Sequence, residues 1–187
     1  VMHELCYAVS DNPLSGFRYG GVIVSNCDIG IDSYKPAAKP AAFGANNHGS
    51  IVEIEGERYI FYHRHTNNTW YSRQGCAEKL SFDGDKIIQA EMTSCGLNDG
   101  PLKGEGEYPS FIACNIFTKD EQMYVGGAGH PYIMQDGRDG DIEPAYITNL
   151  CDGSVIGFKY FDCKGLTAFG IKTRGYAHGN VKIKTTW

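Results

Sequence analysis

The chain has 187 residues, of which 42% are hydrophobic, and it carries a formal net charge of −5 at pH 7. This length suits one large domain or two small ones, and the apolar content is enough for a packed core. An acidic chain without a basic stripe argues against nucleic acid as a partner. No apolar run reaches the roughly 20 residues that cross a bilayer. We therefore expect a globular protein that binds neither nucleic acid nor membranes.

Seven cysteines are scattered through the sequence without any Cys-x-x-Cys pair. An odd and dispersed set predicts neither a compact disulfide framework nor a zinc site. We expect these cysteines to be reduced and partly buried, as free cysteines commonly are. The first residues also lack the basic and apolar regions of a signal peptide. Together these features predict a cytoplasmic location.

Short runs rich in β-branched and aromatic residues predict strands joined by tight turns in the first half of the chain. The predicted strands and hairpin cover residues 5–10, 17–19, 22–24, 50–63, 69–73, 78–82 and 86–90. Residues 55–57 and 83–85 are the turns of two hairpins. Four-strand units at this spacing are typical of propeller blades.

The composition changes at residues 93–107, which are rich in glycine and polar residues. We place the domain boundary there, with the first domain over residues 1–95 and the second over residues 105–187. Further strands are predicted at residues 111–114, 123–125, 132–134, 145–147, 155–161, 168–173 and 181–184. Several of them alternate polar and apolar residues, as half-buried strands of a β-sandwich do.

Histidines and aromatic residues near the 50–63 hairpin are the first candidates for a site. His48 precedes the first strand, where an imidazole can reach a metal, a water or a sugar, although a structural histidine is the alternative. His63 and His65 flank Arg64 and resemble a metal-binding pair. They alternate on a strand, so both face one side, and structural polar packing is the favoured interpretation. Trp70 and Tyr71 could stack on a sugar ring, but core packing is favoured for at least one of them.

Two other groups in the second half have weaker functional interpretations. The acidic cluster at residues 136–143 could bind calcium, but Gly-Asp clusters are more often turns. Tyr160, Tyr176 and Trp187 could form a sugar-binding platform, but alternating aromatic residues usually mark a core.

Several segments resemble glycoside hydrolase family 43. The first half carries the likeness in five segments: residues 3–10, 19–21, 47–53, 59–65 and 71–74. In the second half it lies in residues 157–162 and 174–176. The resemblance implies an all-β fold, with about two C-terminal blades of a five-bladed propeller followed by the start of a jelly-roll-like, carbohydrate-binding-type β-sandwich.

The resemblance also implies an activity and two site residues. Family members are inverting glycosidases, such as α-L-arabinofuranosidases and β-xylosidases, that act on arabinan, arabinoxylan or xylan. By this likeness His48 lies beside a calcium ion, bound directly or through water, and Arg73 approaches the sugar. For Arg73 the alternative is a weak surface ion pair.

The three catalytic carboxylates of the family have no counterpart in this sequence. Inversion needs an acid and a base on opposite sides of the sugar, and both are expected upstream of the strand that begins near His3. We do not assign Glu4 to either role, because it lies inside the matched strand. The sequence therefore predicts part of a glycosidase that is inactive by itself and that self-associates or pairs with missing blades. The alternative is a non-catalytic carbohydrate-binding or structural fragment.

Overall fold

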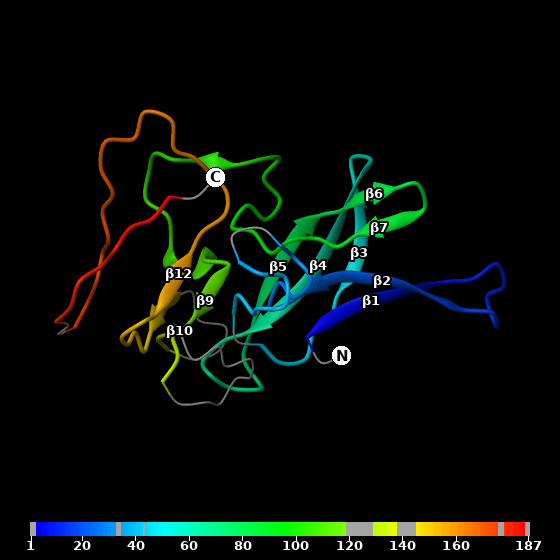
Figure 1. Ribbon diagram of the computed structural model, residues 1–187, viewed down its shortest axis with the longest axis horizontal. Helices are drawn as coiled ribbons and strands as arrows, with labels where there is room; N and C mark the ends of the chain where they lie inside the picture. The colour runs from blue at the N-terminus through cyan, green and yellow to red at the C-terminus, as the bar shows by residue number, and fades with distance from the viewer. Residues whose placement is uncertain are drawn as a thin grey trace.

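The computed structural model describes residues 3–32, 35–42, 44–118, 129–137, 145–175 and 178–185. In this part of the chain the regular structure is β, apart from one turn of 3₁₀ helix at Ser110–Ile112. Figure 1 shows two lobes side by side, one containing β1 to β7 and the other containing β9, β10 and β12. The prediction of an all-β fold is confirmed.

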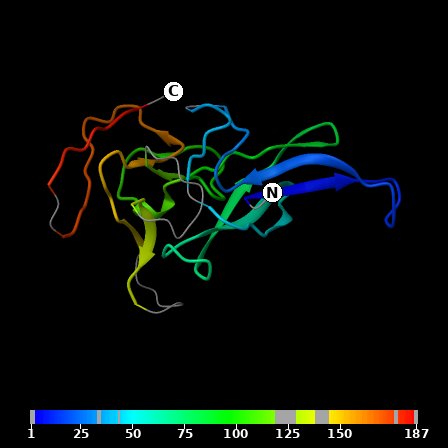
Figure 2. The ribbon, with the colours of Figure 1, turned by 60° about the horizontal axis from the view of Figure 1, so that its bottom comes forward.

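The first lobe contains two antiparallel sheets and a small hairpin. β1 (Glu4–Val9) pairs with β2 (Arg18–Ser25), and the tip of this hairpin projects from the body of the molecule in both ribbon views (Figures 1 and 2). The second sheet has the order β3-β4-β5. Its strands are β3 (Ser50–Ile54), β4 (Glu57–His65) and β5 (Arg73–Lys79). The hairpin consists of β6 (Ser81–Asp83) and β7 (Lys86–Ile88).

The turn between β3 and β4 follows directly from the sequence. Glu55 and Gly56 are its two central residues, and their φ angles are +52° and +85°. Positive φ at both positions matches the right-handed twist of the flanking strands, and glycine adopts it without steric cost. This turn fixes the register in which Ile54 faces Glu57 and Ser50 faces Phe61.

The core of the first lobe lies between its two sheets. Ile23 and Val24 of β2 are buried against Ile60 and Tyr62 of β4. Ala90, Met92 and Cys114 follow β7 and belong to this cluster, so the chain beyond the β6–β7 hairpin returns to cover it. The other buried members are Ala42 and Leu80.

The second lobe consists of short paired strands. β9 (Asn115–Phe117) pairs with β12 (Val155–Gly157), and β10 (Tyr132–Gln135) pairs with β11 (Ala145–Thr148). The two pairs share a small core that includes Ile116, Ile133, Ile147 and Ile156. β8 (Leu102–Lys103) and β13 (Phe161–Asp162) form a parallel pair. Two sheets over a shared core correspond to the predicted sandwich arrangement.

Five strand predictions need comment. Residues 69–73 were predicted as a strand, but residues 66–72 form a loop and β5 begins at Arg73. Residues 111–114 lie in and after the 3₁₀ turn, and β9 begins one residue later. Residues 168–173 and 181–184 are exposed and form no ladder with the described part of the chain, so their β propensity has no partner strand to act on. The strand predicted at 123–125 falls outside the described residues.

Buried polar contacts join the two lobes. Arg64 of β4 donates from Nη1 and Nη2 to the carbonyls of Ala113 (2.5 Å) and Phe111 (2.6 Å). Lys159 donates from Nζ to Asp28 at 2.9 Å and to Glu91 at 2.8 Å. Arg64 lies between two histidines of β4 and points to the opposite face of the strand. The strand that carries the candidate histidines is therefore held from behind by the second lobe.

Candidate functional site

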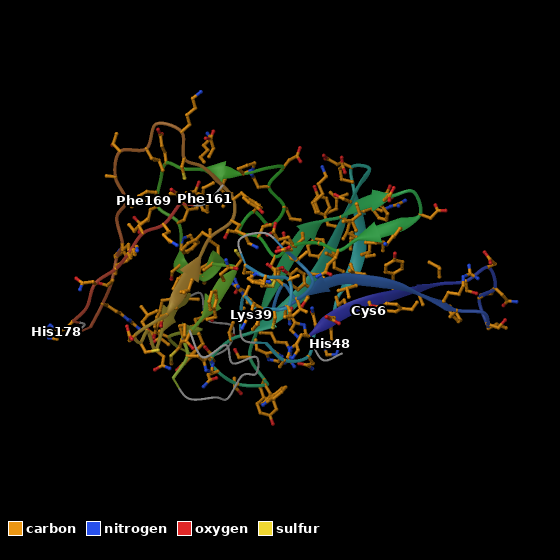
Figure 3. All side chains as sticks on the ribbon, in the orientation of Figure 1. Cys6, Lys39, His48, Phe161, Phe169 and His178 are labelled. Carbon is orange, nitrogen blue, oxygen red and sulfur yellow. The ribbon has the colours of Figure 1, made fainter. Side chains whose placement is uncertain are left out.

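One end of the three-stranded sheet brings the predicted site residues together. In the register of the sheet, His63 of β4 lies opposite Gly75, and His65 lies opposite Arg73, the first residue of β5. β3 begins opposite Phe61, so His48, two residues before β3, reaches the same end. Figure 3 labels His48 in the first lobe. The sequence predicted His48 and Arg73 as separate candidates, and the structure places both beside His63.

His63 links His48 and Arg73. The rings of His48 and His63 stack with centroids 5.3 Å apart and an interplanar angle of 26°. Arg73 donates from Nε to Nε2 of His63 at 3.1 Å, and from Nη1 to the Tyr71 carbonyl at 3.3 Å. An imidazole nitrogen that accepts a hydrogen bond must be unprotonated, so His63 carries its proton on Nδ1. The guanidinium is thereby oriented while it stays exposed to solvent.

Electrostatics keep the inner histidines neutral. Burial lowers the pKa of His63, and repulsion from the Arg73 guanidinium lowers it further. Burial and the same guanidinium also lower the pKa of His65. His65 bridges Asn46 (2.6 Å) and the Thr69 carbonyl (3.2 Å), which ties the segment before His48 to the loop after β4. The prediction that His63 and His65 pack as polar residues on one side of the strand is confirmed by their ring contact at 5.6 Å.

A glycine allows the His48 segment to approach β4 closely. A Cβ atom at Gly49 would lie 2.2 Å from the carbonyl oxygen of Phe61 and 2.8 Å from Cδ1 of Leu5. Both distances are shorter than real contacts, so a side chain there would displace His48 from His63. The close approach of this segment to β4 therefore requires glycine at position 49.

An open pocket of about 770 Å³ begins at this end of the sheet. His48 and His63 line one part of it, and Glu78 and Thr93 line another. The pocket combines imidazole and carboxyl groups with an apolar wall, a composition that suits a small polar ligand.

The predicted calcium site finds only partial support in the side chains. Calcium prefers six to eight oxygen ligands, whereas the ring of His48 stacks on the imidazole of His63. In the described residues no group of three or more His, Cys, Asp or Glu side chains could share a metal ion. Asn47 is buried and neither polar atom of its side chain has a hydrogen-bond partner within the described part. His48 and Asn47 could contribute to a metal site but do not form one alone.

Two weaker candidates remain, the acidic cluster at residues 136–143 and the aromatic residues of the second half. Their described members have other partners in the structure. Asp136 binds Arg174 at 2.7 Å and accepts a hydrogen bond from Tyr146 at 2.8 Å, so this carboxylate has an ion-pair partner. The rest of that cluster, residues 138–144, lies outside the described residues. Tyr160 donates its hydroxyl to Glu91 at 2.5 Å. Tyr176 and Trp187 also lie outside the described part, so a platform of these three aromatic residues stays a prediction.

Comparison with known proteins shows what the chain is similar to. No family model matches it. Over its whole length it is 60% identical to a curated protein of Thermoclostridium stercorarium named xylosidase/arabinosidase, of which it covers 41%. This match agrees with the resemblance to glycoside hydrolase family 43 that the sequence carries. The chain therefore spans less than half of the length of that curated relative.

More distant relatives have related names. The chain is 24% identical over 97% of its length to an arabinoxylan arabinofuranohydrolase of Paenibacillus polymyxa, of which it covers 27%. A solved family-43 β-xylosidase/α-arabinofuranosidase from a compost microbial metagenome, in complex with xylotriose and in a calcium-free form, is 30% identical. That match covers 48% of this chain and 23% of the other, with a TM-score of 0.36.

Sequence reasoning missed the part that His63 plays and the buried carboxyl of Glu78. The signal for His63 was its position opposite Gly75, two residues into β5, from which its ring accepts a hydrogen bond from Arg73. Glu78 lies in β5, whose sequence Arg-Gln-Gly-Cys-Ala-Glu-Lys is mostly polar. The neighbouring residues in the sequence do not indicate that its side chain is buried.

Proposed function

We propose that this chain is the part of an inverting α-L-arabinofuranosidase or β-xylosidase that supports the sugar site without supplying the catalytic carboxylates. The 60% identity over the whole chain to a xylosidase/arabinosidase carries the proposal. The arrangement of His48, His63 and Arg73 supports it, because an oriented and exposed guanidinium can donate to sugar hydroxyls or to a catalytic carboxylate. Arabinan, arabinoxylan and xylan are the proposed substrates.

The chemistry requires groups from outside the described site. An acid must protonate the glycosidic oxygen while a base activates water on the opposite face of the sugar. The described partners of His48, His63 and Arg73 include no carboxylate. In this proposal the acid and base come from other parts of the full-length protein, and so do the oxygen ligands of any calcium beside His48.

The edge of the sheet supports pairing with other parts of that protein. β3 is an edge strand, and Ile51, Val52 and Ile54 are 41%, 42% and 39% exposed. Exposed apolar edges favour association with another strand or surface. We propose that the rest of the longer protein covers this edge and that the isolated chain self-associates.

We also propose a cytoplasmic location for this protein. All seven cysteines are free; Cys27 and Cys114 are buried, whereas Cys6 and Cys151 are exposed. Exposed free thiols suit a reducing environment such as the cytoplasm. The described part of the chain has no helix of the length and apolar character needed to span a membrane.

Activity assays test the proposed function. We expect the full-length protein to release the aryl alcohol from an aryl α-L-arabinofuranoside or an aryl β-D-xyloside, and the preferred sugar names the substrate. The isolated chain should release none, because it lacks the acid and the base. Robust hydrolysis by the isolated chain would contradict the proposal that the acid and the base lie elsewhere in the full-length protein. No hydrolysis by the full-length protein would contradict the proposed function.

Replacing Arg73 should lower kcat/KM of the full-length protein about 10- to 100-fold, the range expected for hydrogen bonds from a charged group. Arg73→Lys should not restore activity, because an ammonium cannot bind His63 and the sugar in the same geometry. Arg58→Ala is the matched control, since Arg58 is an exposed arginine of the same sheet that pairs with Glu53. Full activity of Arg73→Ala would contradict the role.

A further inference from the structure

The loop that joins β4 to β5 is held rigidly by its own side chains. The backbone N–H of Thr66 donates to the Ser72 carbonyl at 3.0 Å, and the hydroxyls of the two residues lie 2.9 Å apart. Asn67 adds a hydrogen bond from Nδ2 to the Ser72 hydroxyl at 3.0 Å. Closing the loop at its base fixes the direction in which residues 68–71 project.

The second lobe holds the same loop from one side. The backbone N–H of Asn67 donates to the Ile133 carbonyl at 2.7 Å, and Oδ1 of Asn67 accepts from the backbone of Gln135 at 3.2 Å. Both partners belong to β10, so the loop is attached to the edge of a second-lobe strand. Its position relative to the candidate site is therefore set by both lobes.

The loop exposes two large aromatic side chains. Trp70 is 44% exposed and Tyr71 is 86% exposed. The Trp70 ring contacts the edge of His65 at a centroid distance of 5.9 Å, so it packs only in part. The backbone of Tyr71 accepts a hydrogen bond from Arg73. A rigid loop with exposed rings next to an oriented guanidinium is suited to hold a ring-shaped ligand, because the C–H face of a sugar packs on an aromatic face.

We propose that Trp70 and Tyr71 form a second sugar subsite, which takes a pentose ring of the polysaccharide chain next to the sugar that is cleaved. This inference rests on the proposed function for the identity of the sugar. The aromatic pair adds affinity for chain substrates and contributes nothing to the binding of a free pentose, which lacks the second ring. The second lobe then affects substrate choice through its contact with Asn67.

Kinetics of full-length variants test the subsite. Tyr71→Ala and Trp70→Ala should raise KM for xylo- or arabino-oligosaccharides about 3- to 10-fold, as expected for one aromatic contact. The inhibition constant of free xylose or arabinose, which fills only the subsite of the cleaved sugar, should not change. Tyr71→Phe should retain the wild-type KM, since it keeps the ring. Phe17→Ala is the control, because Phe17 is 62% exposed on the distant β1–β2 hairpin.

A binding measurement separates this inference from the proposed function. The chain has two tryptophans, so Trp187→Phe leaves Trp70 as the one reporter. Xylohexaose or arabinohexaose should change its fluorescence, and Tyr71→Ala should weaken that response even if the enzyme proves inactive. No response to either sugar overturns the subsite while leaving the hydrolase intact. A lower melting temperature of Tyr71→Ala with unchanged KM overturns it too, since the ring then packs on another segment of the protein.

Discussion

Replacing Lys159 with methionine is expected to lower the free energy of unfolding by about 3–5 kcal/mol, the usual cost of removing one partner of a buried ion pair. Lys159 bonds Asp28, whose side chain has 0% exposure, and Glu91. Burial alone lowers the pKa of Lys159, but attraction to Asp28 and the bond to Glu91 outweigh it and raise the pKa, so the ammonium stays charged. Without it, a carboxylate remains buried between the lobes.

The melting temperature of the purified chain measures this effect. At about 2–4 °C per kcal/mol for a chain of this size, the expected drop is about 6–20 °C. Lys172→Met is the matched control, since Lys172 is also in the second half but its side chain is 92% exposed. Adding Asp28→Asn to Lys159→Met should recover part of the loss. Equal melting temperatures for the Lys159 and Lys172 variants would show that the ion pair does not join the lobes.

The parts of the fold that the sequence predicts well are those determined by neighbours in the chain. The hairpin over 50–63 follows from alternating β-rich runs around Glu55 and Gly56, whose turn fixes the register. The separate pairing of β4 with β5 places His65 opposite Arg73 and His63 opposite Gly75. The family resemblance named His48 and Arg73 one by one, and this pairing brings both beside His63.

Predictions failed where side-chain hydrogen bonds or distant partners decide the structure. Residues 69–73 have high β propensity, but the side chains of Thr66, Asn67 and Ser72 close a loop instead. Residues 168–173 have the composition of a strand without a partner in the described part. The bond between Lys159 and Asp28 joins residues 131 positions apart, and no local pattern can predict such a contact.

Glu78→Gln is expected to remove a pH dependence of stability. Burial raises the pKa of Glu78 to about 7 from 4.5, although bonds from Thr93 and Tyr62 favour the carboxylate. Because the folded state holds this proton more tightly than the unfolded state, stability is greatest below the unfolded pKa and falls as pH rises through 7. A difference of about 2.5 pKa units corresponds to about 3 kcal/mol lost between pH 4 and pH 8.

Urea unfolding of the purified chain between pH 4 and pH 8 tests this expectation. Glu78→Gln should flatten the pH profile and be up to about 3 kcal/mol more stable than wild type at pH 8, because glutamine can still accept from the Thr93 backbone without a charge. Glu53→Gln on β3 is the matched control, since its side chain is 59% exposed and should leave the slope unchanged. If Glu78→Gln kept the wild-type slope, the carboxyl of Glu78 would have to be ionised in the folded protein at neutral pH. The ionised carboxylate of Glu78 would then accept the hydrogen bonds of Thr93 and so hold the segment that leads into the second lobe.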